Sequence, residues 1–310
     1  MTSCLYDINK YVAKTNMSAK TRILVEGSDD KDHIVNLLDV VKSGHRVRVD
    51  TAEMIKGDCG ITRRNNRAKI DKIYSICKNS NGHKKLYYLC DREFLKFEVE
   101  KVIVDLMGEH EADGNFSWTI GHSIENYFFN EAILIDAYRY LCGSSFKSSA
   151  QNIFVALLPS IFKLVANITL AAKEIEKSSY PIGVLMWEDF EVSNEKISLK
   201  NSWLSRNENQ VAAAFNNQLN RFGPIVEASE ELICSRICRG HTAMVMFQRI
   251  FSACIFYSGS IENKEKAFKD SNIFANLKES NVSSALCEAW LRKVQEGKAI
   301  YPINLVDSVS

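Results

Sequence analysis

The chain has 310 residues, of which 46% are hydrophobic, and its formal net charge is +1. This length and apolar content suffice for one large domain or two smaller ones, and four prolines and 14 glycines are too few for a disordered or fibrous chain. The small net charge excludes an overall attraction to nucleic acid or to a membrane, so such a contact requires a local patch.

Strand and helix patterns alternate between residues 20 and 130. The apolar run RILVE (22–26) predicts a buried strand, and the helical pattern DDKDHIVNLLDVV follows it. Valine-rich alternation predicts a second strand at 46–52, followed by an amphipathic helix in RRNNRAKIDKIYSIC. KKLYYLCD (84–91) and FSWTIGHS (116–123) predict two more strands, and a helix with Ser123 as its N-cap is expected next. This order predicts βαβ units and a mainly parallel sheet flanked by helices.

Helical patterns dominate the second half of the chain. A Gly/Ser-rich stretch at 143–150 suggests a boundary between an α/β domain, 1–145, and a mostly helical domain, 146–310, that contacts a partner or a second copy. Short strands or turns are expected at 178–190 and 195–203. The expected helices span residues 131–142, 150–178, 206–221, 227–238, 242–257 and 283–296.

The most apolar segment is NIFVALLPSIFKLVANITLAA (152–172), which Pro159 and Lys163 interrupt. This interruption favours a buried pair of helices over a membrane span. The N-terminus MTSCLYDINK lacks the apolar region of a signal peptide. The nine cysteines follow no repeated spacing, so we expect reduced, mostly core-filling thiols in a cytosolic protein.

Three of the predicted strands end on side chains with acidic or hydroxyl oxygens. Glu26 ends the first strand, Asp91 and Glu93 follow the third, and Ser123 and Glu125 follow the fourth. Residues two apart on an extended segment face the same way, so each of the two pairs is expected to present both oxygens to one point. Because ligands gather at the carboxyl ends of the strands in such sheets, the pattern predicts a single acidic site.

An acidic site of this kind predicts bound metal. Converging carboxylates repel one another, and hard cations such as Mg²⁺ or Mn²⁺ neutralise them. Two such ions about 3.5–4 Å apart can activate water and stabilise the leaving oxygen of a phosphodiester. Gly27 is expected to form a tight turn that leaves room at the strand end. The expected ligands are Glu26, Asp30, Asp91, Glu93, Ser123 and Glu125.

A simpler explanation stays open for the acids behind the first strand. Asp29, Asp30 and Asp32 open the following helix, and acids at helix N-termini complement the helix macrodipole. The three acidic elements taken together favour the metal site over this explanation.

The segments VEGSDD and YYLCDRE resemble the TOPRIM domain of topoisomerases, primases and old-type nucleases, over about residues 20–130. The family pattern has a glutamate and glycine after the first strand and a D-x-D pair after a later one. The old-type subset adds an acid four residues after the glutamate and an S-x-E element, which match Asp30 and Ser123 with Glu125. Glu93 stands where the D-x-D pair has an aspartate, so a longer side chain offers the oxygen at that position.

The order of CDRE, HSIENYF and a helical C-terminal half resembles the standalone TOPRIM effectors of bacterial anti-phage systems of the PARIS type. This resemblance implies a bacterial cytoplasmic nuclease that an ABC-type ATPase holds inactive and releases upon infection. It implies cleavage of host RNA, with transfer RNA as the substrate, and we expect a homodimer after release. Glu26, Asp91, Glu93 and Glu125 would be catalytic. The alternatives are a DNA nuclease of the old type and an inactive regulatory subunit of the ATPase complex.

Residues 56–85 contain nine Lys and Arg residues and only two acids, so Arg63, Arg64 and Arg67 are expected to contact substrate phosphates. A solvated helix face explains the same excess. His122 is a candidate general acid or RNA contact, although a packed or capping histidine fits equally.

Old-type nucleases also have a distal lysine, which has no clear equivalent in this chain. The segment CRGHTAMVMFQR (238–249) offers Arg239 and His241 as phosphate contacts instead. A helix end at Gly240 explains these residues equally well.

Overall fold

The computed structural model describes residues 6–42, 47–193 and 196–309. The chain forms two compact units. Unit 1 comprises Met1–Arg92, Met107–Ile124 and Leu291–Ser310, and unit 2 comprises Glu93–Leu106 and Glu125–Trp290. Residues 143–150, where the sequence suggests a boundary, lie inside unit 2.

Unit 1 is built on a five-stranded sheet with the order β3-β2-β5-β9-β8. β2 pairs in parallel with β3 and β5, β5 pairs in parallel with β9, and the short edge strand β8 is antiparallel. The predicted α/β class with a mostly parallel sheet is therefore confirmed. The strands are β2 (Arg22–Val25), β3 (Arg48–Thr51), β5 (Leu86–Cys90), β8 (Ala112–Asp113) and β9 (Phe116–Trp118).

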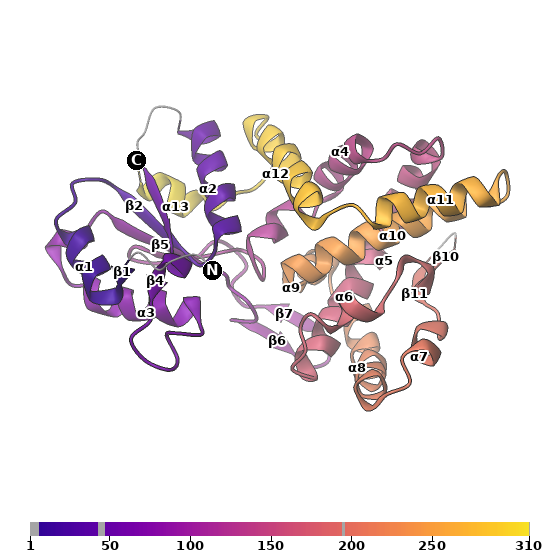
Figure 1. Ribbon diagram of the computed structural model, residues 1–310, viewed down its shortest axis with the longest axis horizontal. Helices are drawn as coiled ribbons and strands as arrows, with labels where there is room; N and C mark the ends of the chain where they lie inside the picture. The colour runs from indigo at the N-terminus through magenta and orange to yellow at the C-terminus, as the bar shows by residue number, and fades with distance from the viewer. Residues whose placement is uncertain (1–5, 43–46, 194–195, 310) are drawn as a thin grey trace. The chain divides into compact units, whose positions relative to one another are not determined.

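Helices cover both faces of this sheet. Figure 1 shows α2 (Ser28–Val41) on one side and α1 (Ile8–Asn16) and α3 (Asn66–Cys77) on the other. Successive side chains of a strand point to opposite faces of the sheet, so each face has its own apolar layer. Leu24 of β2, for example, packs in the core that residues of α1 and α3 share. The remaining unit 1 elements are β1 (Tyr6–Asp7), paired with β4 (Ile55–Lys56), the 3-10 helices η1 (Ala52–Met54) and η2 (Asn81–His83), and α13 (Ile303–Ser308).

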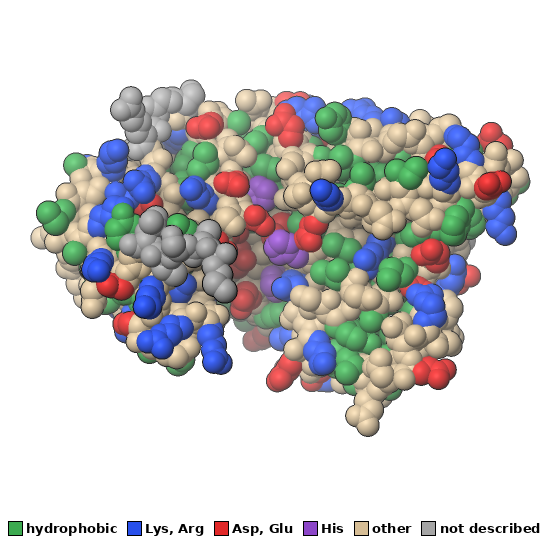
Figure 2. All heavy atoms as spheres, in the orientation of Figure 1, with side chains coloured by type: hydrophobic (Ala, Val, Ile, Leu, Met, Phe, Trp, Pro, Cys, Tyr) green, Lys and Arg blue, Asp and Glu red, His purple; other side chains and the backbone are tan. Residues whose placement is uncertain are grey.

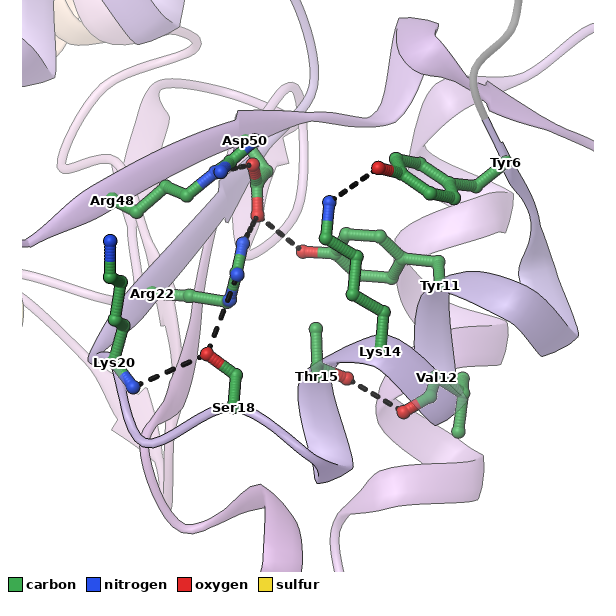
Figure 3. A network of polar contacts seen from close by, with 10 residues as sticks. All are labelled: Tyr6, Tyr11, Val12, Lys14, Thr15, Ser18, Lys20, Arg22, Arg48 and Asp50. Carbon is green, nitrogen blue, oxygen red and sulfur yellow. Dashed lines mark hydrogen bonds and ion pairs between the residues drawn. The ribbon is translucent and has the colours of Figure 1, made fainter.

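A polar network fixes the amino end of the sheet. Asp50 of β3 accepts hydrogen bonds from Arg22 Nη1 at 2.7 Å, Arg48 Nε at 2.8 Å and the Tyr11 hydroxyl at 3.2 Å (Figure 3). Arg22 opens β2 and Tyr11 lies in α1, so one carboxylate joins two strands to a helix. Glu26 follows the opposite end of β2, away from this network.

Unit 2 is mostly helical, and α5 packs against α4, α8, α9 and α10. Asparagine side chains begin several helices: Asn130 Oδ1, for example, accepts from the N–H of Ile133 at 3.1 Å. Two hairpins add β6 (Phe97–Val99) with β7 (Ile103–Asp105) and β10 (Phe190–Val192) with β11 (Ile197–Leu199). The helices are η3 (Ile124–Phe128), α4 (Glu131–Leu141), α5 (Lys147–Glu174), α6 (Tyr180–Val184), η4 (Trp187–Asp189), α7 (Ser202–Arg206), α8 (Gln210–Glu227), α9 (Glu231–Ile237), α10 (Gly240–Gly259), α11 (Lys264–Ala275) and α12 (Glu279–Gln295); η3 and α12 cross the unit boundaries.

The predicted pair of helices at 152–172 is wrong, because α5 continues without a break through Pro159 and Lys163. Among the described residues, α5 is the one helix that is long and apolar enough to cross a membrane by length and composition. In its most apolar window, 56% of the residues are buried inside the structure.

The predicted strand at 116–123 is also too long, since β9 ends at Trp118. The chain then bends, because the N–H of Thr119 donates to the Cys90 carbonyl and the Thr119 hydroxyl donates to Gly121 O. Ser123 does not cap an α-helix: it precedes the 3-10 helix η3, and Asn130 caps α4 instead.

The predicted core-filling position of most cysteines is confirmed for the described residues. All eight described cysteines are free thiols, and every one except Cys59 is buried. Cys4 lies outside the described residues.

Candidate active site

Glu26 and Asp91 meet at the carboxyl end of the parallel sheet in unit 1. Glu26 directly follows β2, and Asp91 directly follows the neighbouring strand β5. Glu26 Oε1 accepts a hydrogen bond from the Asp91 N–H at 3.1 Å, and the Glu26 side chain is 19% exposed. The predicted proximity of these two residues is therefore present in the fold, with a carboxylate close to solvent.

Arg67 of α3 lies against the same strand ends. Its Nη1 donates to the Asp91 carbonyl at 2.7 Å and lies 3.9 Å from Glu26 Oε1, while its Nε donates to Asp71 at 3.1 Å. Burial lowers the pKa of Arg67, but its charged and hydrogen-bonding neighbours, among them the Asp71 and Glu26 carboxylates, keep this pKa above its usual value. Arg67 thus has a structural role as a fixed positive charge, and the substrate contact expected of it stays a prediction.

Gly27 and Asp30 build the start of α2. The Gly27 N–H donates to Asp30 Oδ2 at 2.8 Å, so this carboxylate closes the helix N-terminus as an ordinary first-turn acid does. Gly27 has φ −124° and ψ 175°, an extended conformation open to any residue and not the expected tight turn. A Cβ at Gly27 would lie 3.4 Å from Glu53 Oε1, so the glycine keeps space beside that carboxylate.

Glu53 is the site residue that the sequence reasoning did not include. It lies in η1, immediately after β3, and is exposed. The three adjacent parallel strands β3, β2 and β5 are therefore followed by Glu53, Glu26 and Asp91. The segment DTAE contained the signal, since its glutamate lies two residues beyond the strand.

Asp91 and Glu93 do not form the predicted pair on one extended segment. β5 ends at Cys90, and Glu93 has φ +51°, a left-handed conformation, so the two residues do not alternate along an extended segment. Arg92 between them is 1% exposed; its N–H donates to the Thr119 hydroxyl at 2.9 Å and its Nη1 to Ile120 O at 2.8 Å. Glu93 itself is exposed and belongs to unit 2.

Ser123 and Glu125 do not form the predicted pair on an extended segment either. Ser123 lies in a bend and Glu125 in the 3-10 helix η3, where residues two apart do not face each other. Ser123 and His122 are 6% and 7% exposed within unit 1, and Glu125 is the first residue of the adjoining segment of unit 2. The burial of His122 agrees with the alternative explanation given above, in which this histidine packs in the protein interior.

Within unit 2, Glu125 faces His241. Glu125 is 4% exposed, and its Oε1 lies 3.6 Å from His241 Nε2. The other ring nitrogen, Nδ1, lies 2.5 Å from Glu279 Oε1 of α12. His241, a predicted substrate contact, thus lies between two carboxylates. One belongs to Glu125, a predicted metal ligand, and the other to Glu279, which was not predicted as a site residue.

Asn126 holds this part of unit 2 in place. Its Nδ2 donates to the carbonyls of Ser235, Arg236 and Cys238 at 2.8, 3.1 and 3.0 Å, at the end of α9. Arg239, which follows Cys238 in the sequence, donates through Nη1 to Ser179 Oγ at 3.3 Å and Thr242 Oγ1 at 3.1 Å. Its guanidinium therefore helps to build the start of α10.

The basic residues of 56–85 divide into structural and accessible ones. Lys69 is buried and donates to Ala52 O at 3.0 Å, and Lys72 pairs with Asp58 at 2.6 Å. Arg63 and Arg64 are exposed in the turn before α3. Figure 2 shows several Lys and Arg side chains on the visible face of unit 1. Arg63 and Arg64 are thus placed where a polyanion can reach them.

The chemistry at the strand ends suits a hard cation. The side chains that follow β3, β2 and β5 carry carboxylates, whereas burial raises the pKa of the adjacent Cys90 thiol well above its usual value and keeps it protonated. Among the described residues, no group of three or more His, Cys, Asp or Glu side chains is already arranged to hold a metal ion.

No protein-family model matches this chain, and no curated protein matches it.

Proposed function

We propose that the protein is a metal-dependent TOPRIM-type nuclease that acts as a toxic effector in anti-phage defence and cleaves host RNA, with transfer RNA as its substrate. The supporting observation is the position of Glu53, Glu26 and Asp91 after three adjacent parallel strands of unit 1. Ligands of open α/β sheets bind at this edge. The resemblance of VEGSDD, CDRE and HSIENYF to AriB, the effector of the PARIS system, supports the finer assignment.

Glu26 and Asp91 are the proposed metal ligands with the best structural support, and Glu53 joins them as a third. Bound Mg²⁺ or Mn²⁺, in the proposed two-ion site, would activate water and stabilise the leaving oxygen of the phosphodiester. Contacts within the chain position the proposed ligands. The Asp91 N–H donates to the Glu26 carboxylate, and Arg67 donates to the Asp91 carbonyl. Glu93, Glu125, Asp30 and Ser123 stay candidates on the sequence pattern.

The proposed partner is an ABC-type ATPase of the AriA kind, which holds the effector inactive in the bacterial cytoplasm until infection. After release, the effector is proposed to act as a homodimer. Arg63 and Arg64 are the proposed phosphate contacts, because they are exposed and no carboxylate pairs with them among the described residues.

Calorimetric titration with Mn²⁺ tests the metal site directly. We expect the wild type to bind Mn²⁺ and Glu26→Gln to bind it about tenfold more weakly or not at all, since the variant lacks one charged ligand. Asp32→Asn is the matched control, because Asp32 is an exposed acid of the same helix start that the site does not use. Equal Mn²⁺ affinity in the wild type and Glu26→Gln would refute the assignment.

A second candidate function is a catalytically inactive regulatory module of the ATPase complex. The left-handed conformation of Glu93 favours it, because the second acid of the D-x-D element does not extend from the strand beside Asp91. A module of this class binds the ATPase but shows no Glu26-dependent metal binding and cleaves no nucleic acid, so the same titration separates the two functions.

A further inference from the structure

Unit 2 contains a cavity of about 440 Å³, and none of the acids that follow the strands of unit 1 lines it. Its volume lies within the range of about 300–1,000 Å³ that is usual for small-molecule sites. It lies between α5, α8 and the segment from β11 to α7. Asparagines from three of these elements line it: Asn167, Asn201, Asn216 and Asn220.

Asn167 of α5 forms part of the wall of this cavity. Its Nδ2 donates to the Leu219 carbonyl at 3.1 Å, whereas its buried Oδ1 has no hydrogen-bond partner among the described residues. This oxygen is shielded from the solvent that enters the cavity, so Asn167 helps to build the wall, and the polar groups open to a ligand come from α8.

α8 presents a row of polar groups to the same space. Asn216 and Asn220 lie four residues apart and therefore on one face of the helix, and neither side chain forms a hydrogen bond with the described part of the chain. Pro224 has no N–H, so the Asn220 carbonyl lacks its helical donor. Donors and acceptors are thus both offered along this wall.

Gly223 keeps the cavity open beside Asn167. A Cβ at this position would lie 3.7 Å from Asn167 Nδ2, which is an ordinary contact, so the backbone does not require glycine here. The absence of a side chain instead leaves space, at the cost of placing glycine inside a helix.

We propose that this cavity binds a nucleobase, carried by a free nucleotide or by one nucleotide of an RNA strand. An amide presents a donor and an acceptor side by side, as the edges of bases do, and asparagine pairs with bases in this way. Leu164, Ile197 and Leu219 supply apolar walls for a planar ring. Lys196 supplies positive charge for the attached phosphate, whereas Lys163 donates through Nζ to the carbonyl of Glu227, which also lines the cavity, at 2.7 Å.

Binding of nucleoside 5′-monophosphates to the full-length protein tests the proposal. Calorimetry is run with AMP, CMP, GMP and UMP, and with ribose 5-phosphate as the probe without a base. We expect at least one nucleotide to bind with a Kd of about 1 mM or lower and ribose 5-phosphate not to saturate. Failure of all four nucleotides to bind, or equal binding of ribose 5-phosphate, overturns the proposal.

Variants of α8 locate the binding. The double variant Asn216→Ala, Asn220→Ala should weaken binding about tenfold or more, and Gly223→Leu should abolish it by filling the cavity. Asn217→Ala is the matched control, because Asn217 is exposed on the same helix and does not line the cavity. If the folded double variant binds like the wild type, the cavity is not the site.

Competition identifies the source of the base. A short single-stranded RNA that displaces the nucleotide supports a base within a strand, and an RNA that does not displace it supports a free nucleotide; both results support base binding. The inference does not depend on the nuclease assignment, because Glu26→Gln is expected to bind nucleotide as the wild type does.

Discussion

The Glu26 carboxylate accepts a hydrogen bond from the Asp91 N–H, with 3.1 Å between oxygen and nitrogen. This contact joins the ends of two neighbouring parallel strands, β2 and β5. It gives Glu26 a structural role in addition to the proposed metal-binding one, and substitutions can separate the two.

Glu26→Gln and Glu26→Ala should differ in stability but not in activity. Glutamine keeps an oxygen that accepts from the Asp91 N–H, whereas alanine leaves this half-buried donor without it, at a cost of about 1–3 kcal/mol. Both variants lose the charge and should lose nuclease activity. Urea unfolding and an RNA cleavage assay measure the two effects, and an active, well-folded Glu26→Gln protein would contradict the proposed role.

Gly57→Ala should destabilise unit 1. A Cβ at Gly57 would lie 2.3 Å from the Thr62 carbonyl carbon and 2.4 Å from the Arg63 nitrogen, so the backbone of the loop must move. We expect a loss of about 1–3 kcal/mol. Gly60→Ala is the matched control in the same loop, because no heavy atom lies within 4 Å of its Cβ position. Equal melting temperatures for the two variants would argue against the close approach.

Stability should fall as the pH rises above about 8.5, where thiols of an unfolded chain begin to ionise. Burial raises the pKa of Cys234 to about 12 and also raises those of Cys254 and Tyr138. The folded state therefore keeps protons that the unfolded state loses, and alkali favours unfolding. Melting temperatures between about pH 7 and 10 measure this. Cys234→Val should make the decline shallower, and a flat profile for the wild type would disagree.

Cys59 should be the first of the described cysteines to react with iodoacetamide in the native protein. It is exposed, and the hydrogen bond from the Thr62 side chain lowers the pKa of its thiol. Peptide mass spectrometry gives the labelling rate at each cysteine. Cys254, which is buried, serves as the internal control, and similar rates at both positions would contradict the structure.

The strands of unit 1 could be predicted from sequence because their apolar runs are short and bounded by polar residues. RILV and LYYLC form β2 and β5 as expected, and Glu26 and Asp91 follow them directly. The end of β9 could not be predicted, because it depends on a contact between two buried residues far apart in sequence. The Arg92 N–H donates to the Thr119 hydroxyl just beyond the ends of β5 and β9. The pattern FSWTIGHS alone indicates a longer strand.

Two candidate residues, one in each unit, could be identified only from the fold. Glu53 lies in a short 3-10 helix beyond β3, and only the strand order shows that it follows the neighbour of β2. Glu279 is 38 residues from His241 in sequence, so no local pattern joins them. α5 was predicted as two helices because a proline usually ends a helix, whereas packing against α4, α8, α9 and α10 keeps it continuous.

The most direct test of the central claim is the sequencing of cellular RNA ends after expression of the wild type and of Glu26→Gln in bacteria. The proposed function predicts discrete new transfer-RNA ends with the wild type and none with the variant. The same ends in both strains would contradict the role of Glu26. Growth arrest by the wild type with unchanged RNA and broken chromosomal DNA would contradict the RNA substrate.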